Sequence, residues 1–157
     1  MKKLLLPILA LLLVACSSDD DQQAPIFVQP PVVPSFLKAT INGTEYTFNT
    51  FEVETNTVVD PDHTYVDLNV TATINGDESK NIVFSLEQDV PGADTIYFFY
   101  LMNGADEFDT DHTGAMFNTN VTTNANKRII GTFSGALAKF DNTSTAEITN
   151  GSFDISY

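Results

Sequence analysis

The 157-residue chain has no tryptophan, a single cysteine, two histidines, and only seven basic residues against 21 acidic ones. One cysteine excludes a disulfide framework, and two histidines with that cysteine are too few for the usual structural zinc sites. Because the formal charge is -14 at pH 7, the chain offers no basic surface to a phosphate backbone, so we expect no nucleic-acid partner. The lack of tryptophan also removes the usual flat platform for a sugar ring.

The one long apolar run stands at the amino terminus. Met1-Lys2-Lys3 gives a positively charged start, and residues 4–14 form an apolar stretch interrupted by Pro7. This stretch is shorter than the roughly 20 residues that a transmembrane helix needs. We therefore interpret residues 1–15 as a secretory signal peptide and not as a retained transmembrane anchor.

The end of this run, Leu13-Val14-Ala15-Cys16, resembles the lipobox of bacterial lipoproteins. The resemblance implies that Cys16 becomes the lipidated first residue of the mature chain, held in the membrane by several acyl chains. Ser17 stands where an aspartate would imply retention in the inner membrane, so the outer membrane is expected. The serine and aspartate run of residues 17–21 resembles the surface-export signal of Bacteroidetes lipoproteins, which favours display on the cell exterior over a periplasmic orientation.

Residues 16–34 predict an acidic, proline-rich tether behind the lipidated cysteine. They hold four of the seven prolines, Pro25, Pro30, Pro31 and Pro34. Such a composition favours an extended polyproline II conformation, which would reach roughly 55 Å at about 3.1 Å per residue. Phe27 leaves open an alternative in which this segment folds back onto the domain.

From residue 35 onward, apolar and polar residues alternate with a period of two, as in half-buried strands. Asn42-Gly43 predicts the turn of a first hairpin, and residues 65–74 give the cleanest alternation, followed by a similar pattern around Phe84. Residues 129–137 and 153–157 predict a closing antiparallel pair. We expect a single domain over residues 35–157, an antiparallel β-sandwich of Greek-key or immunoglobulin-like type with about eight to nine strands and little helix.

Three stretches of this domain resemble a family of small surface lipoproteins from Bacteroidetes. They are residues 36–43 (FLKATING), residues 130–135 (IGTFSG) and residues 148–157 (ITNGSFDISY). The resemblance spans most of the domain and implies an all-β, surface-anchored module. Its motifs are turns and strands, so it implies no catalytic residue.

Both histidines follow the same spacing of aspartates, in residues 60–64 (DPDHT) and residues 109–113 (DTDHT). The second segment matches the opening of a calcium loop, where oxygen ligands at alternate positions point inward, although Asn120 stands where an EF-hand has its glutamate. Solvated turns are the alternative, and a joint histidine and carboxylate site for a transition metal is a third. The candidate calcium ligands are Asp109, Asp111, Thr113, Asp60 and Asp62, and no other cofactor is expected.

Residues 95–102 (TIYFFYLM) are apolar on both faces of the strand that they predict. Since one face of a sandwich strand looks outward, either this face is covered by a loop or tether, or it forms a binding surface. The candidate binding patch is Tyr97, Phe99 and Leu101. At the start of the same strand, Asp94-Thr95-Ile96 resembles the O-glycosylation sequence of Bacteroidetes envelope proteins, which makes Thr95 a candidate modification site.

The chain has none of the motifs that commonly carry catalysis. It contains no Gly-x-Ser-x-Gly elbow, no His-Glu-x-x-His helix and no glycine-rich phosphate loop. We expect a non-catalytic binding or structural module on the outer membrane, with an envelope protein or a glycan as its partner. The alternatives are a calcium-dependent adhesion or glycan-binding module and, third, a hydrolase.

Overall fold

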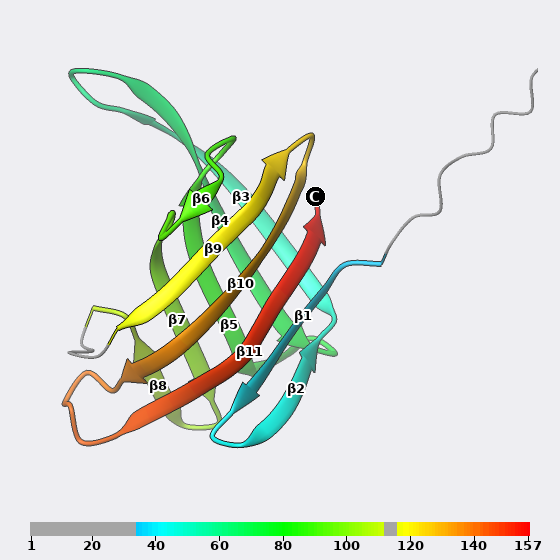
Figure 1. Cartoon of the computed structure of the whole chain (residues 1–157), viewed down its shortest axis with the longest axis vertical. Helices are drawn as coiled ribbons and strands as arrows, with labels where there is room; N and C mark the ends of the chain where they lie inside the picture. Colours follow the sequence, from blue (N-terminus) through cyan, green and yellow to red (C-terminus); the bar gives the residue numbers. More distant parts are fainter. Residues whose placement is uncertain (1–33, 112–115) are drawn as a thin grey trace, which may run out of the picture. The chain divides into compact units, whose positions relative to one another are not determined.

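The structure, a computed structural model, describes residues 34–111 and 116–157 (Figure 1). These residues form eleven strands and no helix, so no helix among them is able to span a membrane. The strands are β1 (Phe36–Ile41), β2 (Thr44–Phe48), β3 (Thr50–Val59), β4 (Thr64–Ile74), β5 (Asp77–Glu87), β6 (Gly92–Ala93), β7 (Ile96–Asn103), β8 (Asp106–Asp109), β9 (Phe117–Ala125), β10 (Arg128–Ala138) and β11 (Thr145–Ser156). The expected signal peptide, Cys16 and the tether up to residue 33 lie outside the described residues.

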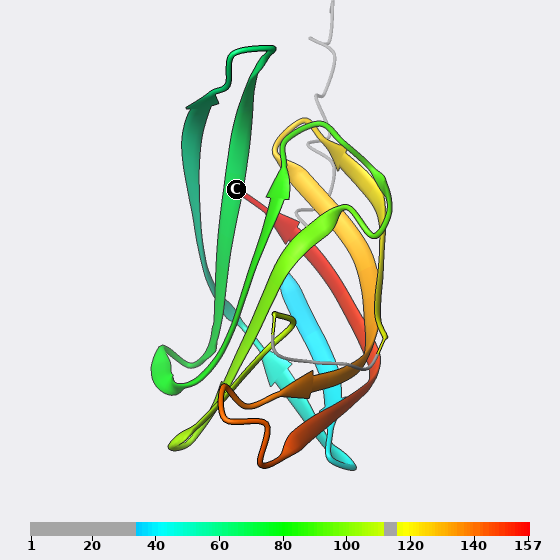
Figure 2. The ribbon, with the colours of Figure 1, turned by 90° about the vertical axis from the view of Figure 1, so that its left-hand side faces the viewer.

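The predicted all-β, antiparallel, sandwich-like class is confirmed. The sheet runs in the order β2-β1-β11-β10-β8-β7-β5-β4-β3, and β9 pairs with β10 and with the short β6. Figure 2 shows the sheet folded into two layers, one formed by β3, β4, β5, β7 and β8 and the other by β1, β2, β9, β10 and β11. The described residues contain more strands than the expected eight to nine because pieces as short as β6 and β8 leave no periodic pattern in the sequence.

The two layers are joined on both sides. On one side, β8 meets β10 through the pair Asp109 and Ala138. On the other side, β2 continues into β3 through Asn49, whose amide donates to the carbonyl of Thr73 in the neighbouring layer at 3.0 Å. The first and last strands of the pairing order therefore belong to one continuous stretch of chain.

Phenylalanine rings fill the space between the layers. Phe84 and Phe99 come from one layer, and their centroids lie 5.1 Å from Phe153 and 4.9 Å from Phe133 of the other layer, respectively. Phe117 closes the group at 4.7 Å from Phe99. Aromatic contacts at these separations contribute beyond the area they bury, so this group forms the centre of the core.

The closing pair predicted from the sequence is confirmed, and its glycines explain how it packs. In the β10–β11 register, Gly131 lies opposite Phe153 and Phe133 lies opposite Gly151, so each ring covers the glycine across from it. A Cβ atom on Gly151 would clash with the carbonyl oxygen of Phe133, and one on Gly131 would stand 2.5 Å from Cζ of Phe153 and 2.7 Å from the carbonyl oxygen of Asn120. No other residue fits at either position without a shift of the neighbouring backbone as well as the ring.

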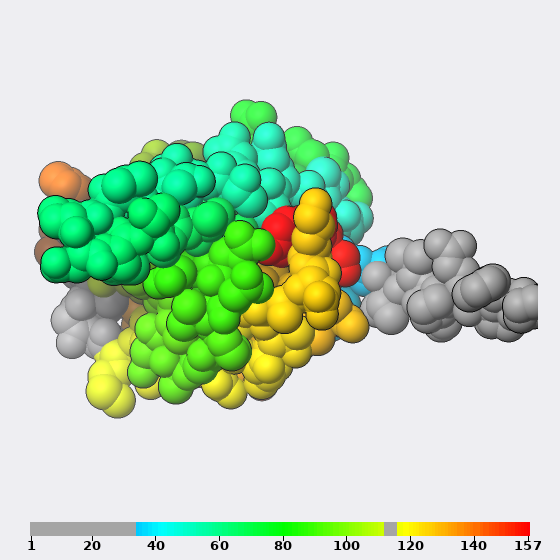
Figure 3. All heavy atoms as spheres, turned by 90° about the horizontal axis from the view of Figure 1, so that it is seen from above, coloured from blue at the N-terminus to red at the C-terminus, as the bar shows by residue number. Residues whose placement is uncertain are grey.

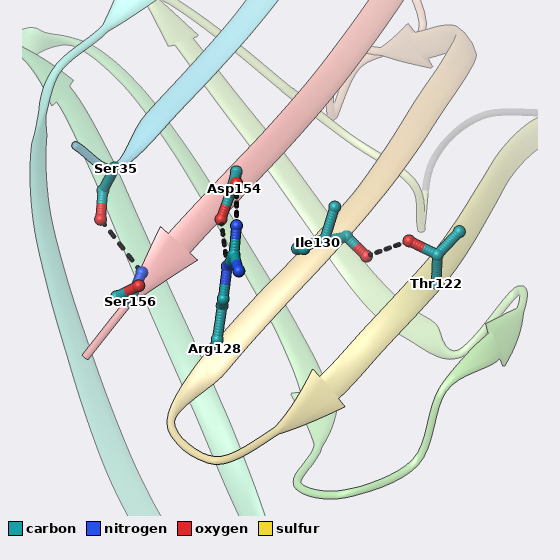
Figure 4. A network of polar contacts seen from close by, with 6 residues as sticks. All are labelled: Ser35, Thr122, Arg128, Ile130, Asp154 and Ser156. Atoms are coloured by element: carbon teal, nitrogen blue, oxygen red, sulfur yellow. Dashed lines mark hydrogen bonds and ion pairs between the residues drawn. The ribbon is translucent and has the colours of Figure 1, made fainter. Parts of the chain in front are cut away.

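The outer face of the same strands carries polar contacts that fix the start of the domain (Figure 4). The Arg128 guanidinium binds both carboxylate oxygens of Asp154, at 2.8 and 2.6 Å, and thereby lowers the pKa of Asp154. The amide of Ser156 donates to Oγ of Ser35 at 3.0 Å. The first residues of the described domain are therefore bound to its last strand.

The expected exposed row of Tyr97, Phe99 and Leu101 is corrected by the structure. Phe99 is 0% exposed and Leu101 is 1% exposed, whereas Tyr97 is 56% exposed. The cause is a bulge: Ser85 pairs with Phe98 but Leu86 pairs with Ile96, which leaves Tyr97 as an extra residue. Phe98, Tyr100 and Met102 lie half-buried on the outer face, and the proposed cover around Phe27 lies outside the described residues.

Candidate ligand-binding site

A hollow of about 410 Å³ lies where the β3–β4 hairpin meets the segment that leads from β5 into β7. Its volume falls within the range of ordinary small-molecule pockets. Figure 3 views this end of the domain and shows the hairpin side by side with that segment. The lining residues are Asp60, His63, Tyr65, Glu87, Val90, Thr95 and Tyr97.

The hairpin tip supplies the first wall. The amide of Asp60 donates to the carbonyl of His63 at 2.9 Å and closes the turn between β3 and β4. Beyond the turn, the rings of His63 and Tyr65 stack at a centroid distance of 5.0 Å and an interplanar angle of 22°. His63 directly precedes β4 and Tyr65 is the second residue of that strand, and their stacked rings form a continuous aromatic surface.

The segment between β5 and β7 supplies the second wall, and β9 holds it in place. The buried side chain of Asn124 donates from Nδ2 to the carbonyls of Glu87 at 2.8 Å and Val90 at 3.3 Å. Asp94 is bound twice to Thr119, through its own amide at 2.9 Å and through its carboxylate at 3.2 Å. This wall is therefore fixed by hydrogen bonds to a strand of the other layer.

Tyr97 stands between the two walls because the bulge turns it outward. Burial, followed by hydrogen bonding to Asp67 and the charge of that carboxylate, raises the pKa of Tyr97 to about 12. One oxygen of this carboxylate, Oδ1 of Asp67, is buried and has no hydrogen-bond partner. The Tyr97 hydroxyl thus remains protonated well above neutral pH.

The electrostatic character of the hollow is acidic. Burial raises the pKa of Tyr65, and the charges of Asp67, Asp60 and Glu87 raise it further. No lysine or arginine is found among the described residues that line the hollow. Negative charge around two phenol rings favours a ligand that brings positive charge or hydrogen-bond donors.

Three residues singled out in the sequence for different reasons meet in this hollow. They are Asp60, expected as a calcium ligand, Thr95, expected as a modification site, and Tyr97, expected in an aromatic patch. Thr95 is half-buried and its hydroxyl donates to the carbonyl of Gly92 at 3.3 Å. Its O-glycosylation stays a prediction.

The remaining candidate calcium ligands lie elsewhere. Asp62 is exposed in the hairpin turn, Asp109 ends β8 opposite Tyr100, and Asp111 follows as an exposed residue. Thr113 lies outside the described residues. Within residues 34–111 and 116–157, no group of three or more histidine, cysteine, aspartate or glutamate side chains lies close enough together to hold a metal ion.

Glu87, Val90 and Tyr65 line the hollow but were not singled out in the sequence. A tyrosine on the polar face of an alternating strand was the one available signal, because an aromatic ring placed there is free to contact a ligand.

Comparison of the chain with models of known protein families, with curated proteins and with solved structures finds no match.

Proposed function

We propose that this chain is an outer-membrane lipoprotein, displayed on the cell exterior, that acts as a non-catalytic binding module and holds its ligand in the hollow beside Tyr97. The observation that carries the proposal is the construction of the hollow, whose walls come from separate segments and are fixed by Asn124 and Asp94. Walls held in this way reduce the ordering that a ligand must impose when it binds.

Binding is favoured over catalysis by the state of the phenol groups. A catalytic base or nucleophile needs a pKa near the working pH, whereas the neighbours of Tyr97 and Tyr65 raise the pKa of both hydroxyls. These hydroxyls therefore stay protonated near neutral pH, and their rings offer apolar faces. Such groups recognise a ligand without changing it.

The hollow is tested by nuclear magnetic resonance on the mature chain from residue 16, made soluble by Cys16→Ser. We expect a panel of small fragments that includes neutral monosaccharides, amines and carboxylates to shift amide signals at residues 60–65 and 87–97. Binding of monosaccharides there would support the glycan-binding alternative. Fragments that bind only at other surfaces would contradict the proposed site.

The anchor is tested separately in cells. Cys16→Ser is expected to move the protein from the membrane fraction to the soluble fraction while its melting temperature stays unchanged, because Cys16 precedes the domain expected over residues 35–157. Ser17→Ala, which leaves the lipidated cysteine in place, is the matched control and should stay with the membrane. Retention of the Cys16→Ser protein in the membrane fraction would refute lipid anchoring.

A further inference from the structure

We propose that the hollow binds an alkylammonium group, with the ring faces of Tyr65 and Tyr97 and the carboxylates of Asp60 and Glu87 as its contacts. The inference rests on the proposed function in one respect, namely that the hollow is a ligand site. It adds the charge and the chemical class of the ligand, which are argued from residues elsewhere in the domain as well as from the hollow itself.

The first argument comes from contacts between lysines and aromatic rings elsewhere in the domain. Three of its own lysines place their ammonium groups over aromatic faces: Lys38 over Phe36 at 5.6 Å, Lys80 over Tyr46 at 5.3 Å and Lys139 over Phe108 at 5.9 Å. Cations within about 6 Å of a ring centroid are attracted by the ring quadrupole. The rings of the hollow have no such cation among the described residues that line it.

The second argument is the pairing of carboxylates. Asp154 is bound by Arg128, and Asp106 is bound by Lys139 at 2.6 Å. Around the hollow, by contrast, three carboxylates act on the Tyr65 hydroxyl, those of Asp67, Asp60 and Glu87. One of them, Asp67, also keeps a buried oxygen without a hydrogen-bond partner. A bound cation would lower the repulsion among these three charges.

The third argument is the accessibility of the Tyr97 ring, which is 56% exposed and lines the hollow, so a cation is able to reach it. Burial and the nearby Asp67 carboxylate raise the pKa of Tyr97 to about 12, so this ring stays a neutral phenol with negative charge close to it. Tyr65 is stacked on His63 and so has one ring face already covered. Two tyrosine rings with carboxylates near them form the arrangement by which proteins recognise substituted ammonium groups.

The volume of the hollow limits the ligand. About 410 Å³ accommodates a trimethylammonium group or the end of a lysine side chain, and not a folded surface. Two sources offer this chemistry, a free small cation and a lysine of a peptide. The experiment therefore has one arm for each source.

In the first arm, choline and its neutral isostere 3,3-dimethylbutan-1-ol are titrated into the Cys16→Ser mature chain at low ionic strength. In the second arm, Nα-acetyl-lysine methylamide is compared with Nα-acetyl-norleucine methylamide, which has a similar side chain without charge. We expect the cation to bind at least about tenfold more tightly than its neutral partner in one arm, which identifies the source. The amide shifts should map to residues 60–65 and 87–97.

Variants assign the contacts. Glu87→Gln removes a charge at constant shape, and Tyr97→Ala removes a ring; each is expected to weaken cation binding about tenfold. Tyr97→Phe keeps the ring and should retain most of the affinity even if the alanine variant proves unstable. Tyr100→Ala is the matched control, since Tyr100 lies on the same strand outside the hollow, and it should bind as the parent does.

The outcomes separate the two proposals. Equal affinity for cations and neutral isosteres at the hollow would overturn the ammonium inference and leave the hollow as a ligand site. If no fragment, charged or neutral, binds at residues 60–65 and 87–97, both the ligand site and the ammonium inference would be overturned. Cation binding that Glu87→Gln and Tyr97→Ala leave unchanged, and Tyr100→Ala abolishes, would place the site elsewhere and refute the inference.

Discussion

The β10–β11 pair and the β3–β4 hairpin are both long antiparallel ladders, yet they bury their side chains differently. Along β11, alternate residues are buried and contribute Phe153 and Ile155 to the core. In the outer half of the hairpin, from Glu54 to Val59, the ladder continues while the side chains become largely exposed, and Val59 is 76% exposed. The comparison teaches that stability resides where both layers meet, and that a ladder extending beyond the core is free to carry recognition groups.

The largest effect that tests this comparison comes from neighbours on β7. Phe99→Ala should lower the free energy of unfolding by about 4 kcal/mol, since it removes a ring at the centre of the core. Tyr97→Ala, two residues away but exposed, should cost less than about 1 kcal/mol. Denaturant unfolding of both variants measures the difference. Equal losses would contradict the assignment of the bulge at Tyr97.

A smaller effect is expected at the glycine and phenylalanine pairs of β10 and β11. Gly151→Ala places a Cβ atom against the Phe133 backbone and ring, which should cost about 2 kcal/mol in unfolding free energy. Ser152→Ala, the next residue along β11, is the control and should change the unfolding free energy by less than about 0.5 kcal/mol. A Gly151→Ala protein as stable as the parent would show that the β10 backbone at Phe133, and not only its ring, is able to move away.

The Arg128 and Asp154 contact should contribute less and should depend on pH. Because Arg128 lowers the pKa of Asp154 below its ordinary value of 3.8, the stabilisation is present above that value and is lost as pH falls through the lower pKa of the folded state. Asp154→Asn should therefore cost about 1 kcal/mol at pH 7. In thermal melts, the difference between parent and variant should shrink as the pH falls below 3.8 and Asp154 becomes protonated, and a constant difference across pH would contradict this account.

The smallest effect is expected from calcium at the hairpin tip. If the carboxylates of Asp60 and Glu87 bind an organic cation and not calcium, millimolar calcium should shift the melting temperature by less than about 2 °C. A larger increase, lost in Asp60→Asn with Asp62→Asn, would instead support the calcium-dependent alternative at this loop. The same test with Asp109→Asn and Asp111→Asn examines the second aspartate segment.

The fold was largely predictable from local patterns. The alternation around Leu68 and Val70, the Asn42-Gly43 turn and the closing pair each depend on residues close together in sequence, and the structure confirms them. The bulge at Tyr97 was not predictable, because a run that is apolar on both faces gives no sign of a shift in alternation. Phe99 was therefore assigned to the wrong face.

The site was predictable only in parts. Asp60 and Tyr97 were candidates because of the residues next to them in sequence. That they line the same hollow depends on how the β3–β4 hairpin packs beside the segment that carries Glu87. That segment is held by Asn124, whose side chain donates to the carbonyl of Glu87 from 37 residues further along the chain. No pattern within one strand contains this information.

The position of β1 has a mechanical consequence. Ser35, at its start, is held to the last strand through the amide of Ser156, and β1 itself pairs with β11 on one side and β2 on the other. A pull transmitted from residue 34 along this strand would load both ladders in shear, so that many hydrogen bonds resist together and do not open one after another. The domain is thus connected to whatever precedes it through a strand that is well placed to withstand tension.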